Sequence, residues 1–126
     1  MRYTTFGTRT GLRVSEYALG TASFGTTWGG ATRDEARVIL DRFAEAGGTL
    51  LDTADVYGTH PGESEEILGE VLGTDRERFV LATKFGGSMK GANGPDWGAR
   101  GSRRYVRTAV EASLRRRRAD HLDLLQ

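Results

Sequence analysis

Three polar residues of this chain, Asp52, Tyr57 and Lys84, could together move a proton. Asp52 and Lys84 each end a short apolar run, and Tyr57 follows Asp52 by five residues. A tyrosine hydroxyl can donate a proton, and a lysine ammonium beside it stabilises the phenolate that remains. A carboxylate paired with that ammonium orients it and keeps it charged. This set of groups suits proton donation to an oxygen that gains negative charge, as when a hydride reaches a carbonyl carbon.

The spacing alone leaves a second interpretation of these residues open. An aspartate at the end of a strand often caps the next turn, a tyrosine in a loop often packs, and a lysine at a strand end is commonly solvated. The choice between the two interpretations depends on the elements that carry the three side chains.

Short strands that alternate with helices are expected to position these residues. Residues 3–6 and 12–14 flank a glycine-rich segment and predict a β-hairpin. Thr32 and Glu35 have the spacing of a capping box, and apolar residues recur behind them at helical intervals. We expect strands at 17–20, 50–52, 79–84 and 122–126, and helices after Thr32, over 64–72 and after Ser102.

This order predicts a parallel sheet built from βα units. The segment Gly20–Gly25 lacks the G-x-G-x-x-G spacing of a dinucleotide-binding turn, which disfavours a doubly wound sheet. A (β/α)8 barrel typically needs ~250 residues, and this chain supplies about half of that. If Leu50, Asp52 and Lys84 face the inside of such a barrel, Asp52 and Lys84 lie on neighbouring strands at the rim where barrel active sites form.

The composition excludes several classes of protein. The 126 residues include 18 Lys and Arg and 17 Asp and Glu, and a net charge of +1 gives no overall attraction to nucleic acid or to an anionic membrane. The chain has no cysteine, no apolar run near the ~18–20 residues of a membrane span, and no signal-peptide core at its start. Asp52, Asp55 and His60 lack a recognised metal-ligand spacing. We expect a cytoplasmic protein with no metal, no nucleic-acid partner and no membrane contact.

Two further patterns have plain interpretations beside functional ones. The run Arg115–Arg118 could bind phosphate or nucleic acid. It ends a predicted helix, however, where cations favour the helix dipole, and four successive residues spread around a helix. Trp28 and Trp97 lie in predicted loops that face the rim, where they either line a substrate pocket or simply pack.

The motifs of the chain resemble those of the aldo-keto reductases. The likeness rests on Gly20–Gly25, Leu51–Gly58, Ala82–Lys84 and Glu111–Arg115, which occur in order and at the family's distances. The D-T-A-x-x-Y-G block followed by A-T-K is highly specific, and the chain is most similar to the bacterial aryl-alcohol dehydrogenase-like branch. The resemblance implies an α/β fold: the N-terminal half of a (β/α)8 TIM barrel, with a β-hairpin before about four βα units, truncated within the fourth strand.

The resemblance also implies an activity. The family reduces aldehydes and ketones to alcohols, so NADP(H) is the expected cofactor and a small carbonyl compound the expected substrate. By the resemblance Tyr57 is the proton donor, Lys84 makes the phenol more acidic and Asp52 pairs with Lys84. Gly20 and Thr21 would lie beside the nicotinamide, together with Asp52. Residues 1–126 are then one partial NADP-dependent oxidoreductase domain.

The chain departs from the family pattern at its end. The family's active-site histidine would stand two residues beyond Gln126, and neither His60 nor His121 takes its place. Because four parallel strands leave two unpaired edges, we expect residues 1–126 alone to be unstable as a monomer and inactive. A piece of a longer protein, a shortened reading frame and a self-associating half-barrel all stay open. The alternative function is a non-catalytic regulatory or interaction module on the same fold, like the potassium-channel β subunits, or an inactive remnant.

Overall fold

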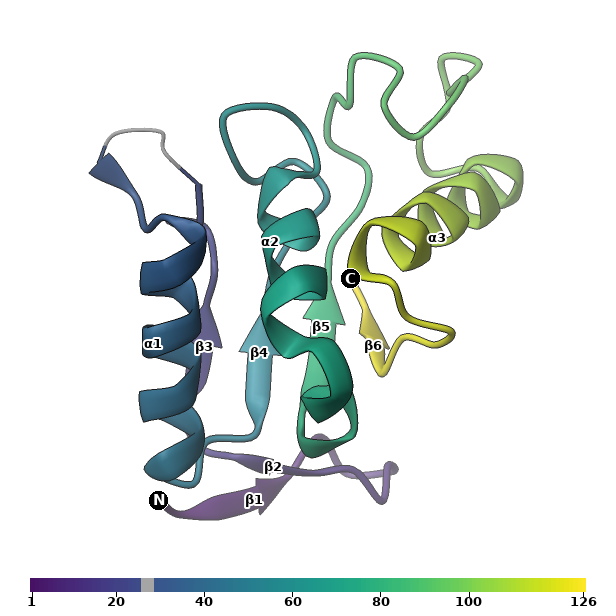
Figure 1. The fold of residues 1–126 in the computed structure, drawn as a ribbon. Helices are drawn as coiled ribbons and strands as arrows, with labels where there is room; N and C mark the ends of the chain where they lie inside the picture. Colours follow the sequence, from purple (N-terminus) through teal and green to yellow (C-terminus); the bar gives the residue numbers. More distant parts are fainter. Residues whose placement is uncertain (26–28) are drawn as a thin grey trace.

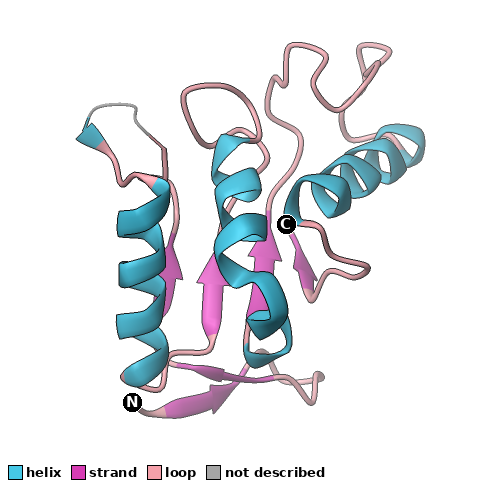
Figure 2. Cartoon of the chain, viewed as in Figure 1, coloured by secondary structure: helices cyan, strands magenta, loops and turns pink. Residues whose placement is uncertain are grey.

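A computed structural model describes residues 1–25 and 29–126, which form a hairpin and a parallel sheet with helices between its strands (Figures 1 and 2). The antiparallel hairpin joins β1 (Tyr3–Thr5) and β2 (Arg13–Ser15). The parallel sheet has the order β3 (Ala18–Gly20), β4 (Leu50–Asp52), β5 (Val80–Thr83) and β6 (Leu124–Leu125). Between these strands run α1 (Arg33–Glu45), α2 (Glu63–Leu72) with the 3-10 helix η2 (Gly73–Arg78), and α3 (Arg103–Arg117). The predicted hairpin and the alternating parallel βα order are confirmed.

Two of the three α-helices begin where the sequence predicts. Thr32 caps α1 in a complete capping box with Glu35, and the Ser102 side chain accepts a hydrogen bond from the Tyr105 amide at the start of α3. The helix α2 begins at Glu63, one residue before the predicted start, and its N-cap Gly62 has φ +97° and no side-chain cap. The predicted first residue, Ser64, is instead fully buried.

One face of the parallel sheet packs against α1 and α2 (Figure 1). Leu51 and Leu81 are paired in register on β4 and β5, and both have no exposed surface. Because side chains alternate along a strand, Asp52 and Lys84 point to the opposite face. Burying each leucine contributes roughly 1.5–3 kcal/mol. The packing of the helices on Leu51 and Leu81 therefore fixes which face Asp52 and Lys84 occupy.

A glycine brings α2 close to α3. A Cβ added at Gly69 would lie 2.7 Å from the carbonyl oxygen of Arg116 and 2.8 Å from the Cα of Arg117. Only glycine allows this approach of two backbones. It places the last turn of α3 against α2 at Gly69, one helical turn from Glu65.

The hairpin lies across the amino ends of the parallel strands (Figure 1). The Ser15 amide donates to Thr49 Oγ1 at 2.9 Å, and the Thr49 amide donates to Ser15 Oγ at 3.0 Å. These reciprocal bonds attach the hairpin to the start of β4. Across residues 1–25 and 29–126, no helix has the length and apolar character needed to cross a bilayer.

Candidate active site

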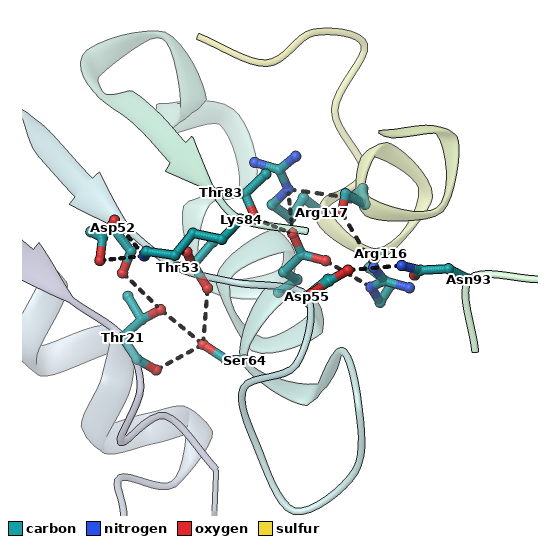
Figure 3. A network of polar contacts seen from close by, with 12 residues as sticks. Thr21, Asp52, Thr53, Asp55, Ser64, Thr83, Lys84, Asn93, Arg116 and Arg117 are labelled. Atoms are coloured by element: carbon teal, nitrogen blue, oxygen red, sulfur yellow. Dashed lines mark hydrogen bonds and ion pairs between the residues drawn. The ribbon is translucent and has the colours of Figure 1, made fainter. Parts of the chain in front are cut away.

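Asp52 and Lys84 form an ion pair at the carboxyl ends of neighbouring strands. Lys84 Nζ lies 2.7 Å from both Oδ1 and Oδ2 of Asp52 and donates a third hydrogen bond to the Thr53 carbonyl oxygen at 3.0 Å (Figure 3). Both side chains are 34% exposed, so the pair is open to a bound molecule. The ammonium has all three N–H groups engaged, which fixes its position on the open face of the sheet.

Tyr57 lies beside this pair, on the loop that joins β4 to α2. Its ring centroid is 5.4 Å from Lys84 Nζ, and its side chain is half-buried. Two backbone bonds hold the residue: the Tyr57 amide donates to the Ala54 carbonyl at 3.2 Å, and the Ser64 amide donates to the Tyr57 carbonyl at 3.1 Å. The structure thus brings together the three side chains that the sequence singled out, and their catalytic roles stay a prediction.

The two remaining predicted residues, Gly20 and Thr21, have different surroundings. Gly20 is opposite Asp52 in the register of β3 and β4, it is exposed, and a Cβ there would meet no atom within 4 Å. Thr21 has no exposed surface, and its hydroxyl lies 2.8 Å from Ser64 Oγ. The Thr21 side chain therefore packs into the helix side of the sheet, and a place for Gly20 and Thr21 beside the nicotinamide stays a prediction.

A pocket of about 610 Å³ opens beside Tyr57. Its described lining is mainly apolar and comes from the loops after β3 and β4, namely Ala22–Gly25, Gly29, Gly30 and Val56–Gly58. The Thr59 amide donates to Glu63 Oε2 at 2.5 Å, which closes the second of these loops and lowers the pKa of Glu63. A small apolar molecule could reach the Tyr57 side chain from this pocket.

The tryptophans do not both contribute to that pocket. Trp28 lies outside the described residues. Trp97 is 45% exposed and stacks on the guanidinium of Arg104, whose Cζ lies 3.6 Å from the ring centroid. Trp97 is absent from the described lining beside Tyr57 and lines a separate hollow along α3. Trp97 therefore stacks on Arg104 at the protein surface, and a role for it in lining a substrate pocket stays a prediction.

Comparison with known proteins decides the family. The model of the aldo/keto reductase family matches residues 16–126. The chain belongs to this family. Norsolorinic acid reductase stcV of Emericella nidulans is 43% identical over 91% of this chain and 32% of its own length. Relatives named as oxidoreductases of Bacillus subtilis are also among the matches.

Two solved structures share the fold of this aldo/keto reductase chain. The holo form of aldo-keto reductase AKR11C1 from Bacillus halodurans has a TM-score of 0.79 and 35% identity, over the whole of this chain and 39% of its own. An aldo-keto reductase from Klebsiella pneumoniae in complex with NADPH has a TM-score of 0.69 and 29% identity, over 90% of this chain and 34% of its own. The chain matches the N-terminal part of these barrels, and it spans about a third of the length of the curated relatives it matches.

Behind the site of this aldo/keto reductase chain lies a buried ionic cluster that sequence reasoning missed (Figure 3). Glu65 has no exposed surface; it accepts from Thr83 Oγ1 at 2.7 Å and from Arg116 Nε at 2.8 Å, and it lies 3.4 Å from Arg117 Nε. Burial lowers the pKa of Arg117, and the negative charge of Glu65 opposes this effect. The arginine run is therefore not simply solvated: Arg116 and Arg117 anchor α3 to α2, while Arg115 and Arg118 are exposed.

Asp55 is a second buried acid near the site. Its Oδ2 accepts from Asn93 Nδ2 at 2.8 Å, and its amide donates to the Lys84 carbonyl at 3.1 Å. Burial raises the pKa of Asp55, although the hydrogen bond from Asn93 acts in the opposite direction. His60 is exposed, and within the described part of the chain no three His, Cys, Asp or Glu side chains are grouped so that they could hold a metal ion.

Proposed function

We propose that residues 1–126 form the N-terminal part of an NADPH-dependent reductase that converts aldehydes and ketones to alcohols. One observation carries the proposal: the Lys84 ammonium bonds both oxygens of Asp52 and lies 5.4 Å from the Tyr57 ring centroid. Membership of the aldo/keto reductase family and the similarity to a relative solved with NADPH support it.

The residues present fit a flat cofactor ring on the open face of the sheet. Gly20 has no positive φ, and a Cβ built there would meet no atom within 4 Å, so this position leaves open space beside Asp52. Gly20 and Asp52 would hold the nicotinamide, with the buried Thr21 behind them. Bound NADPH would supply the hydride that adds to the carbonyl carbon of the substrate.

Tyr57 then acts as the general acid. Its hydroxyl donates a proton to the carbonyl oxygen as that oxygen gains negative charge. The Lys84 ammonium stabilises the phenolate that results, and Asp52 with the Thr53 carbonyl holds Lys84 in place. The apolar lining beside Tyr57, which includes Phe24 and Val56, favours a substrate with an apolar or aromatic body.

The test uses the full-length polypeptide that carries these residues and follows NADPH oxidation with an aromatic aldehyde. Tyr57→Phe is expected to lower kcat by about 10²–10⁴-fold, the usual contribution of a general acid, and to leave the Kd for NADPH unchanged. Tyr17→Phe is the matched control, because Tyr17 is 70% exposed on the protein surface. A Tyr57→Phe variant that keeps the wild-type rate would reject the role of Tyr57.

Wild-type protein that neither binds nor oxidises NADPH would favour the non-catalytic module instead. We expect the isolated 126 residues to show no turnover.

A further inference from the structure

The Ser64 hydroxyl is a buried junction between the ends of two strands. Ser64 has no exposed surface, and its Oγ donates to the Thr21 carbonyl oxygen at 2.8 Å (Figure 3). The same oxygen lies 2.8 Å from Thr21 Oγ1 and 3.3 Å from Thr53 Oγ1. Thr21 follows β3 and Thr53 follows β4, so one side chain on α2 connects both strand ends from the helix side.

The hydrogen-bonding capacity of this hydroxyl is fully used. A serine hydroxyl has one hydrogen to donate and two lone pairs that accept. The hydrogen goes to the Thr21 carbonyl, and the two lone pairs can accept from the hydroxyls of Thr21 and Thr53. Removing the Ser64 hydroxyl would take one partner from each of these three groups. The Thr21 carbonyl would keep the Phe24 amide at 2.9 Å and the Thr21 hydroxyl could still donate to the Asp52 carbonyl at 3.4 Å, whereas the buried Thr53 hydroxyl has no other hydrogen bond among the described residues, which is costly.

Both residues that Ser64 holds are bonded directly to the candidate site. The Thr21 amide donates to the Asp52 carbonyl at 2.9 Å, and the Thr53 carbonyl accepts from Lys84 Nζ at 3.0 Å. Gly20 precedes Thr21, and Asp52 precedes Thr53. A shift of either strand end would therefore move Gly20 or the Asp52–Lys84 pair.

Ser64 also contacts the tyrosine loop, through its backbone. The Ser64 amide donates to the Tyr57 carbonyl at 3.1 Å. A side-chain substitution keeps this amide bond and removes only the bonds to Thr21 and Thr53. The two effects can thus be separated by experiment.

We propose that Ser64 is a positioning residue, which holds the Gly20–Thr21 and Asp52–Thr53 segments in the register that receives the nicotinamide. The proposal rests on the proposed function for the identity of the bound molecule. The junction itself is a property of this chain, and it can be measured whether or not the protein turns over a substrate.

The test compares Ser64→Ala with Ser113→Ala in the full-length polypeptide. Ser113 is the matched control: it is a buried serine whose hydroxyl bonds Arg116 on the same helix, away from the strand ends. We expect Ser64→Ala to speed hydrogen–deuterium exchange at residues 19–22 and 52–54 and to raise the Kd for NADPH by about tenfold. Ser113→Ala should change neither these exchange rates nor the Kd for NADPH, even if it lowers the melting temperature as much as Ser64→Ala does.

Thr21→Val gives a second variant, since it removes one hydroxyl while keeping the side-chain shape. It should speed exchange in the same segments by a smaller factor, and it replaces Ser64→Ala if that variant does not fold. Unchanged exchange and unchanged Kd in a folded variant would overturn the proposal. Wild-type protein that binds no NADPH would refute the proposed function and the cofactor part of this inference together. The exchange rates alone would still decide whether Ser64 joins the strand ends.

Discussion

Replacing Arg117 by methionine is expected to stabilise the protein, although it removes a buried ion pair. Arg117 is 3% exposed, and its Nη1 and Nη2 have no hydrogen-bond partner among the described residues. Its Nε donates to the Ser113 carbonyl at 3.2 Å and lies 3.4 Å from Glu65 Oε1. Burial also lowers the pKa of Arg117, because it penalises the charged guanidinium more than the negative charge of Glu65 favours it.

The magnitude follows from what the substitution removes and what it keeps. Each buried polar atom without a partner costs about 1–3 kcal/mol, and two such atoms, Nη1 and Nη2, disappear with the guanidinium. Glu65 loses its 3.4 Å contact but keeps Arg116 at 2.8 Å and Thr83 at 2.7 Å. The methionine side chain keeps most of the apolar contacts of the arginine stem. We expect the free energy of unfolding to rise by about 1–3 kcal/mol, because Glu65 keeps Arg116 as its partner and is not left as an uncompensated buried charge.

Urea unfolding of the full-length polypeptide, followed by circular dichroism, measures this change without adding salt. Arg116→Met is the matched variant, because it removes the shorter contact and leaves Glu65 with the 3.4 Å contact alone. It should lower the free energy of unfolding by about 3–5 kcal/mol. If Arg117→Met lowers stability as much as Arg116→Met does, the Arg117–Glu65 pair outweighs the two unpartnered groups and the reasoning is wrong.

Two more substitutions test the backbone and the pH dependence. Arg118 ends α3 with φ +51°, a conformation that costs roughly 1 kcal/mol for a residue with a Cβ. Arg118→Gly should therefore raise the free energy of unfolding in urea by about 1 kcal/mol, whereas Arg115→Gly inside the helix should lower it by about as much. Burial raises the pKa of the Asp55 carboxyl above its ordinary value of 3.8, so the folded state binds this proton more tightly than the unfolded state does. The contribution of Asp55 to the free energy of unfolding therefore falls as the pH rises from 3.8 through the raised pKa. Thermal melts across this window should show Asp55→Asn becoming more stable relative to wild type as pH rises; a difference that is flat or runs the other way would contradict the assignment.

The fold was accessible from the sequence because its local patterns agree with one another. Thr32 and Glu35 cap α1 as their spacing predicts, and the alternation in β4 and β5 correctly separates Leu51 from Asp52. The placement of Asp52 and Lys84 on neighbouring strands follows from the same alternation. Strand ends were less accurate: Phe79 and Lys84 lie outside β5, which runs from Val80 to Thr83.

The buried polar groups could not be predicted, because they depend on contacts between distant segments. Ser64 looks like the start of a helix, yet its hydroxyl bonds residues 43 and 11 positions away. Arg117 belongs to a run that suggests a solvated helix end, yet the close approach at Gly69 draws it inside. One pattern could have suggested this: four consecutive helical residues point in different directions, so at least one of them faces the interior.

Asp52 and Lys84 lie at strand ends that hydrogen bonds attach to the helices, whereas loops form the pocket beside Tyr57. The Asp52–Lys84 pair and the surfaces proposed to select the substrate therefore belong to separately supported parts of the chain, and Tyr57, which lines the pocket, belongs to the loop part. Changes in length or sequence between Gly58 and Gly62 can reshape what enters without loosening the ion pair. Divergence among related proteins would then accumulate in the rim, and new specificities could arise while the Asp52–Lys84 pair stays in place.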